Sequence, residues 1–322
     1  MKILVIAKRF KKTSKDDALN RYQSGIRISE ELKRQGHEVN ISFYDFYNLD
    51  VEGIEQYYLE FQPDFVFQTG GVNRSFNTLK FLKSLGAKIV IWHPDAYWLL
   101  QKDKKDLFLE AFDIVDLFIT TMKGHVEISK PYTDKVVWSP HFFDHTYYKS
   151  DNILAKADDV VFVGNKTPCS LQREEYLEEI VKKGYRTVIV GWGFNSLGGV
   201  INYDGKFIAD CYKKSKIGLN MITGGELNYN LQFSVRMYQV MGCGCFLLTE
   251  YIPGIEELFI LGKHLDIFHT KEEMLEKIDY YLKHEDEREQ IAKQGQEEIF
   301  DKYTIDKSVG RYFSIIKERL GL

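Results

Sequence analysis

The feature that most constrains the fold is an alternation of short apolar runs with amphipathic segments, which starts twice along the chain. Residues 2–7 (KILVIA) are the first apolar run, and apolar side chains then recur at helical spacing over about 17–35, up to Gly36. A continuous apolar run is typical of a strand that is covered on both faces. Strands that alternate with helices form parallel sheets through right-handed crossovers. The sequence therefore predicts an α/β fold.

The alternation is interrupted once, at the polar and weakly patterned segment 144–158, which we interpret as a linker. Before it, further strands are expected over 38–45, 63–71, 87–95, 116–121 and 135–140. After it, strands or helices are expected over 159–165, 171–184, 186–193, 208–221 and 271–284. The prediction is two Rossmann-like doubly wound parallel-sheet domains, residues 1–150 and 159–304, facing a cleft. Ligands of such sheets bind at the carboxyl ends of the strands.

Composition narrows the class of protein. A formal net charge of -4 argues against a wholesale basic surface for nucleic acid. Four scattered cysteines fit neither a zinc site nor a disulfide framework, which favours a reducing compartment. The first residues resemble a buried strand more than a signal peptide, and no apolar run approaches the ~20 residues of a membrane span. We expect a soluble cytoplasmic protein without a membrane span.

Two predicted strands end in glycines that suit a ligand site. VFVGN places Gly164 and Asn165 after one strand, with Arg173 eight residues beyond Asn165, and VIVGWGF places Gly191 and Trp192 after the next. A glycine lets a ligand approach the backbone, and the following helix N-terminus favours anions. Trp192 offers a stacking surface. The alternative is that both are ordinary tight turns, since a glycine after a strand is common.

The stretch FSVRMYQVMGCGCFLLTEY (233–251) predicts a helix that opens at Ser234, a suitable N-cap. Arg236 lies in the first turn, where a cation is unfavourable unless an anion offsets it. Gln239 follows three residues later and can bond a ribose diol. On this interpretation, replacing Arg236 with Ala leaves the unliganded protein about as stable, or slightly more stable. The alternative is a solvated polar stripe. Cys243 and Cys245, beside glycines, are expected to be small packing residues.

These motifs resemble those of GT-B glycosyltransferases, and more narrowly of the spore-maturation (CgeB-like) branch. The similarity is carried by VFVGN with its following arginine, by KIGLNM, by SVRMYQVMGCGCFLLTEY, and by ELFILGKHLDIFHTKEEMLEKIDYYL. In the N-terminal half, KIVIWHPDAYW and VVWSPHFFDHTYY are similar to family segments, with less specificity. One residue departs from the family pattern: Gln239 stands where a glutamate that holds the nucleotide ribose is usual.

The resemblance implies a glycosyltransferase that moves a sugar from a nucleotide-diphosphate donor, expected to be a UDP-sugar, to an acceptor hydroxyl without a metal or other cofactor. The C-terminal domain would bind the donor, and a helix over about 305–322 would pack back on the N-terminal acceptor domain. The implied donor-binding residues are Gly164, Asn165, Arg173, Gly191, Trp192, Asn220, Ser234, Arg236, Gln239, Thr249 and Glu250.

The implied catalytic residues are His93 and Asp95, after the fourth predicted strand, as candidate general bases. His93 has an alternative interpretation as an ordinary loop histidine, and His141, His145 and the sugar-binding candidate Glu226 are further options. Two other functions remain open: a nucleotide-sugar 2-epimerase and a non-catalytic two-domain binding protein. The acceptor could be a protein, a glycan or a small molecule, and the net charge makes nucleic acid less favoured.

Overall fold

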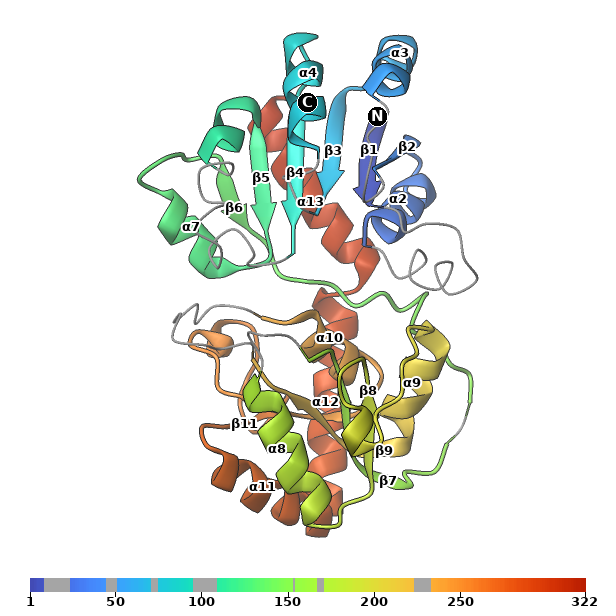
Figure 1. The fold of residues 1–322 in the computed structure, drawn as a ribbon, viewed down its shortest axis with the longest axis vertical. Coiled ribbons are helices and arrows are strands. Elements are labelled where there is room, and N and C mark those ends of the chain that lie inside the picture. Colours follow the sequence, from blue (N-terminus) through green and yellow to red (C-terminus); the bar gives the residue numbers. More distant parts are fainter. Residues whose placement is uncertain are drawn as a thin grey trace. The chain divides into compact units, whose positions relative to one another are not determined.

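The computed structural model describes residues 1–8, 24–44, 51–70, 75–94, 109–152, 154–166, 171–222 and 233–322. The chain divides into two compact units (Figure 1), which are Met1–Pro140 together with Ile305–Leu322, and His141–Thr304. Each unit contains one sheet whose strands all pair in parallel, with helices around it. The predicted α/β class is confirmed.

The first unit has a six-stranded sheet in the order β2-β1-β3-β4-β5-β6. Its strands are β1 (Lys2–Lys8), β2 (Glu38–Tyr44), β3 (Phe65–Thr69), β4 (Ile89–His93), β5 (Leu117–Thr120) and β6 (Val136–Trp138). Its helices are α2 (Ser24–Arg34), α3 (Val51–Phe61), α4 (Phe76–Ser84), α7 (Lys123–Ser129) and α13 (Ile305–Leu320). The middle strands β3, β4 and β5 are buried along their whole length, as their apolar runs predict.

Helix α13 is the last element of the chain, and it is part of the first unit. Tyr312 Oη donates a hydrogen bond to the carbonyl of Pro140 at 3.0 Å, and Lys88 Nζ donates to the carbonyl of Leu320 at 3.0 Å. The ring of Phe313 stacks on His37 with centroids 4.8 Å apart. The apolar face of this helix is therefore buried against residues that precede it by more than 150 positions.

The second unit has a five-stranded sheet in the order β11-β10-β9-β7-β8. Its strands are β7 (Asp158–Val163), β8 (Thr187–Val190), β9 (Ser215–Asn220), β10 (Phe246–Glu250) and β11 (Asp266–Phe268). Its helices are α8 (Leu171–Lys182), α9 (Gly205–Lys214), α10 (Val235–Gly242), α11 (Lys271–Lys283) and α12 (Glu285–Lys302), with short 3-10 turns at Asn195–Leu197 and Ile255–Glu257.

The strand order of the second unit defines where a ligand is expected. From β7 the chain passes through α8 to β8 on one side, and then through α9 to β9 on the other side of β7. The winding direction therefore reverses between β7 and β9. At such a switch point the loops that follow the two strands lead away from each other and leave a crevice at the carboxyl ends.

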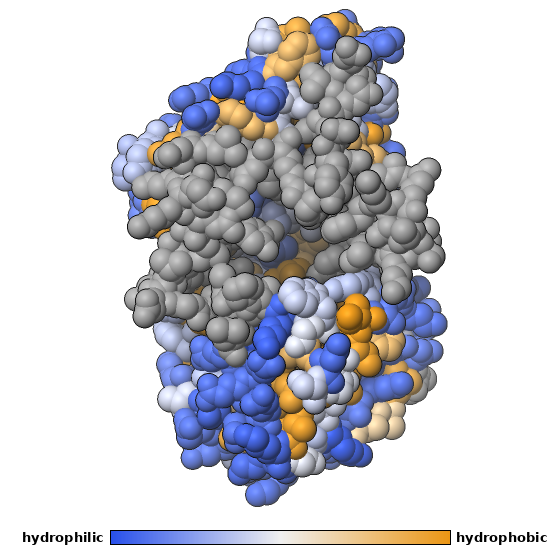
Figure 2. Space-filling view, in the orientation of Figure 1, coloured by the Kyte–Doolittle hydropathy of each residue, from blue (hydrophilic) through white to orange (hydrophobic). Residues whose placement is uncertain are grey.

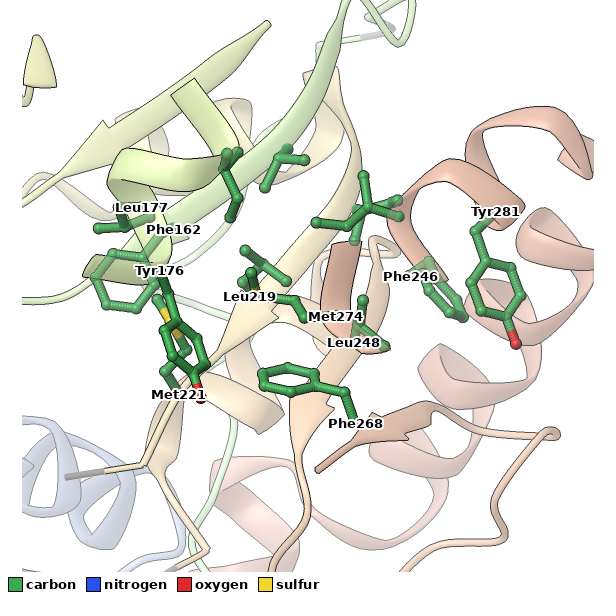
Figure 3. Packing of buried hydrophobic residues seen from close by; sticks show 14 of the residues in the cluster. Phe162, Tyr176, Leu177, Leu219, Met221, Phe246, Leu248, Phe268, Met274 and Tyr281 are labelled. Carbon is green, nitrogen blue, oxygen red and sulfur yellow. The ribbon is translucent and has the colours of Figure 1, made fainter. Parts of the chain in front are cut away.

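One side of this sheet is covered by an apolar core (Figure 3). Phe162, Leu219, Leu248 and Phe268 project from four strands, and Leu177, Met274 and Tyr281 come from helices. The two predicted packing cysteines are confirmed as buried, and burial raises the pKa of Cys245 to about 11. A side chain at Gly242 would come within 2.5 Å of the Phe143 ring, so the small residues here do serve close packing.

Residues 141–150 lie in the second unit, whereas the sequence predicts that they belong to the N-terminal domain. The N–H of Phe143 donates to the carbonyl of Tyr303 at 2.7 Å. The rings of Phe143 and Tyr148 stack with centroids 6.0 Å apart, and both are buried. The polar pattern of this segment suggests a linker, but its aromatic side chains anchor it on the second unit.

The surface of the second unit is rich in hydrophilic side chains (Figure 2), as the charged helices in its sequence predict. On the face of the second unit that Figure 2 presents, hydrophilic side chains predominate over α8, with smaller apolar patches beside them. Within the described residues, no helix combines the length and the apolarity that crossing a bilayer requires.

Candidate functional site

Arg236, from the first turn of α10, lies over the ends of β7 and β9. Its Nε donates to the carbonyl of Val163, and its Nη1 donates to Asn220 Oδ1 at 2.9 Å and to the carbonyl of Met221 at 3.3 Å. The guanidinium carbon lies 4.6 Å from the centroid of the Phe162 ring. The side chain is only 8% exposed. Arg236 is thus a buried cation at the switch point of the sheet.

Arg173, from the first turn of α8, reaches the same place. Its Nε and Nη2 donate to the carbonyl of Met221 at 3.2 and 2.8 Å, and its Nη1 donates to the carbonyl of Asn165 at 3.3 Å. Burial, and then the positive charge of Arg236, lower the pKa of Arg173 to about 9, whereas the charge of Glu250 acts in the opposite direction. Two buried guanidinium groups therefore meet at one neutral carbonyl oxygen.

This arrangement favours a bound anion. A carbonyl dipole satisfies N–H donors but does not neutralise two like charges, whose repulsion is larger in a buried site than in water. An oxyanion placed beside both groups would offset that repulsion and gain charge-assisted hydrogen bonds. Gly164 lets the guanidinium of Arg236 lie close to the backbone, because a Cβ there would lie 2.5 Å from Arg236 Nη2.

Asn220, Thr249 and Glu250 form a connected edge at the ends of β9 and β10. Asn220 Nδ2 donates to Thr249 Oγ1 at 2.8 Å, and Thr249 Oγ1 donates to the carbonyl of Glu250 at 2.9 Å. The Glu250 carboxylate accepts from the N–H of Ile222 at 3.0 Å and from Gln172 Nε2 at 3.3 Å. Burial raises the pKa of Glu250, against these hydrogen bonds. Asn220 and Thr249 are fully buried, so the Glu250 carboxylate is the group of this edge that can accept from hydroxyl groups of a ligand.

The loop after β8 is held against the loop after β7. Gly191 has a φ of +145°, and a Cβ on it would lie 1.9 Å from the carbonyl oxygen of Gly164. The Trp192 N–H donates to Asn165 Oδ1 at 3.0 Å, and its carbonyl accepts from the Lys166 N–H at 3.0 Å. The Trp192 side chain is nevertheless 47% exposed. The backbone of this loop is fixed while its indole remains available to a ligand.

Ser234 is the N-cap of α10, as predicted, and its Oγ accepts from the N–H of Arg236 at 3.2 Å. Gln239, on the next turn, donates from Nε2 to Tyr148 Oη at 2.7 Å. Gln239 is 4% exposed. The alternative of a solvated stripe is therefore wrong, because both polar side chains of this helix are buried. Arg236 and Gln239 share no hydrogen-bond partner.

His93 ends β4 in the first unit and is buried there. Its ring stacks on Phe118 with centroids 6.0 Å apart, and its carbonyl accepts from the N–H of Thr121 at 3.3 Å. Its neighbour His125 lies with Nδ1 3.0 Å from Thr120 Oγ1, and burial together with the charge of His93 lowers the pKa of His125 to about 3.

The structure says less about the other candidate catalytic and sugar-binding residues. Asp95 and Glu226 lie outside the described residues. His141 is buried in the second unit, and this burial lowers its pKa to about 3. Among the residues that the structure describes, no three or more His, Cys, Asp or Glu side chains gather as a metal site would need.

Several parts of the site are not predicted by the sequence. Phe162 lies below both arginines, the carbonyl of Met221 joins them, and Tyr148 bonds Gln239. The first two are adjacent to motifs that were recognised. Tyr148 belongs to the aromatic cluster HFFDHTYY, whose density in a polar segment is the one signal that it packs against something.

Comparison with known proteins adds to this description of the site. Residues 172–314 match the model of a family described as glycosyl transferase-like. Among curated proteins, no sequence matches the chain. Several solved structures are similar over nearly the whole chain, and three of them are compared below.

The first is sucrose-phosphate synthase from Thermosynechococcus elongatus, at 9% identity and a TM-score of 0.69, with 99% of each chain covered. The second is HepE from Anabaena in complex with UDP and glucose, at 12% identity and a TM-score of 0.69, covering 99% of this chain and 100% of that one. The third is an alpha-glucosyltransferase in complex with UDP-glucose and DNA containing an abasic site, at 12% identity and a TM-score of 0.66, covering 98% and 99%.

At such low identity the structural likeness is one of fold, and that fold is GT-B. The chain therefore has the GT-B fold, and its residues 172–314 match a glycosyl transferase-like domain.

Proposed function

We propose that the protein transfers a sugar from a UDP-sugar to a hydroxyl of its acceptor, with no divalent metal at the donor. The observation that carries this proposal is the pair of buried guanidinium groups of Arg173 and Arg236 at the carbonyl of Met221. When a glycosyl group leaves UDP, negative charge develops on the diphosphate. Fixed cations that face this charge stabilise the transition state more than the ground state, which is the role a metal ion would otherwise have.

The remaining residues then take roles that follow from their positions. The diphosphate lies by Gly164, Asn165 and the N-terminus of α10 at Ser234, with Arg236 as its direct partner. Asn220 orients Arg236 through its Oδ1, and Arg173 ties the ends of β7 and β9 together while adding charge. We assign this part of the site to the leaving group.

The donor's other groups lie on either side of the diphosphate in this proposal. The uracil stacks on exposed Trp192, which the close contact of Gly191 holds in place. The ribose bonds Gln239. The transferred sugar bonds the Glu250 carboxylate, which accepts from sugar hydroxyls, and Thr249 supports this residue through its hydrogen bond to the Glu250 carbonyl.

His93 and Asp95 are the proposed general bases. In the transfer, the acceptor oxygen forms a bond to the anomeric carbon, the bond from that carbon to the diphosphate oxygen breaks, and the acceptor proton passes to the base. A neutral imidazole accepts such a proton near neutral pH.

Further observations support our proposals for the nucleotide, the cellular location, the branch of the family and the acceptor. HepE has been solved with UDP-glucose, and the alpha-glucosyltransferase with UDP, which favours UDP as the nucleotide here. The free, buried cysteines Cys211, Cys243 and Cys245 fit a cytoplasmic location. We propose the CgeB-like branch on the sequence motifs, and a protein, glycan or small molecule as the acceptor, with nucleic acid less favoured at a net charge of -4.

The test is release of UDP from UDP-glucose in excess EDTA, with water as the acceptor. We expect slow release by the parent protein, and a loss of about 10²–10⁴-fold in rate for His93→Gln, the usual contribution of a general base. The control is the affinity of the same variant for UDP, which should equal that of the parent. Release that requires a divalent metal, or an epimer or glycal formed from the donor alone, would contradict the proposal.

A further inference from the structure

Gln239 has a fixed orientation in the second unit, because its amide nitrogen donates to Tyr148 Oη at 2.7 Å. Both side chains are buried. A primary amide is planar, with donors on its nitrogen and lone pairs only on its oxygen. When Nε2 is directed at Tyr148, Oε1 must point to the other side. Among the described residues, none donates a hydrogen bond to that oxygen.

Tyr148 is itself held firmly. Its ring stacks on Phe143 at an interplanar angle of 17°, and Tyr147 meets it edge to face with centroids 5.1 Å apart. Phe143 is tied by its N–H to the carbonyl of Tyr303. The position of the Tyr148 hydroxyl oxygen is therefore fixed, and this oxygen accepts from Gln239 Nε2.

Hydrogen bonds connect Tyr147, the neighbour of Tyr148, with the loop that contains Trp192. Tyr147 Oη donates to the carbonyl of Tyr203 at 2.7 Å, and Tyr203 Oη donates to Asn165 Oδ1 at 3.3 Å. Asn165 Oδ1 also accepts from the N–H of Trp192. A continuous set of contacts thus connects the Gln239 side chain with the backbone of Trp192, the residue that the proposed function places at the base.

We infer that Tyr148 is a positioning residue that directs Gln239 Oε1 at a ribose hydroxyl, and thereby lets the site select ribonucleotides over 2′-deoxyribonucleotides. This inference rests on the proposed function. A glutamate presents two equivalent acceptor oxygens and needs no such partner, whereas a glutamine that turned its NH₂ toward the diol would lose the acceptor. Tyr148 is what makes a glutamine adequate at this position.

The experiment compares the dissociation constants of UDP and 2′-deoxy-UDP by calorimetry for the parent, Tyr148→Phe and Tyr147→Phe. For the parent we expect UDP to bind about 3- to 10-fold tighter than 2′-deoxy-UDP, as the loss of one neutral hydrogen bond implies. Tyr148→Phe removes the partner of the amide, and the ratio should fall to about 1. Tyr147→Phe is the matched control: its hydroxyl bonds Tyr203 and not Gln239, so the ratio should stay at the parental value.

A second pair of variants separates orientation from packing. In a Gln239→Glu background the carboxylate needs no orienting partner, so adding Tyr148→Phe should leave the ratio high. A parent that binds UDP but not with the expected preference would overturn the inference, as would an equal loss of both nucleotides in Tyr148→Phe. A parent that binds neither nucleotide would instead overturn the proposed function.

Discussion

Replacing Arg236 with Ala is expected to weaken UDP binding by about 10- to 150-fold, the effect of losing a hydrogen bond to a charged group worth about 1.5–3 kcal/mol. The guanidinium lies over Phe162 with its Nη2 toward Gly164, where the proposed diphosphate binds. Two cations neutralise the anion better than one, so Arg173 alone should not compensate. Calorimetric titration of parent and variant with UDP measures the difference.

The matched control is Arg186→Ala. Arg186 belongs to the same unit, pairs with Asp159 at 3.3 Å and is largely exposed at its side chain, so its loss should leave UDP affinity unchanged. Arg236→Ala should also lower the free energy of unfolding by about 1–3 kcal/mol, because the carbonyl of Val163 and the amide of Asn220 lose a donor. Parental affinity in Arg236→Ala would contradict the role assigned to this arginine.

Gly191→Ala is expected to destabilise the second unit by about 3 kcal/mol or more. At a φ of +145° any Cβ is strained, and this one would lie 1.9 Å from the carbonyl oxygen of Gly164. Strain of this kind costs about 1–3 kcal/mol and overpacking costs a similar amount, so the two effects together set the estimate. The urea-unfolding transition of the purified variant measures the loss.

Gly198→Ala is the control that measures the cost of the positive φ alone, without a steric clash. Gly198 has a φ of +76°, but nothing lies within 4 Å of a Cβ placed there. Its replacement should therefore cost only about 1 kcal/mol, the penalty of a left-handed conformation. If both alanine variants unfolded at the same urea concentration, the close contact between the two loops would not explain why position 191 requires a glycine.

Much of the fold follows from local sequence pattern. The apolar run of KILVIA predicts β1, and the glycines of VFVGN and VIVGWGF mark the ends of β7 and β8. Ser234 predicts the start of α10, because an N-cap depends on a residue and its next two neighbours. These features need no knowledge of the rest of the chain.

The parts that could not be predicted depend on residues far apart in the sequence. Gln239 donates a hydrogen bond to Tyr148, which lies 91 positions away in the sequence. Because the residues next to Tyr148 in the sequence are polar, the local pattern does not predict that its ring is buried. Arg236 was expected to depend on an anion for its place. Instead, backbone carbonyls of the β7 and β9 ends hold its guanidinium. The expectation that its removal leaves stability unchanged is therefore revised.

The most direct test of the central claim is titration of the parent protein with UDP in excess EDTA, repeated with Mg²⁺. The claim is that the cations at the switch point of the second sheet, and not a metal ion, hold the diphosphate. We expect one UDP per chain, the same dissociation constant in both buffers, and an affinity that falls as salt screens the charges. Absence of binding, or binding that appears only with the divalent cation, would contradict the account.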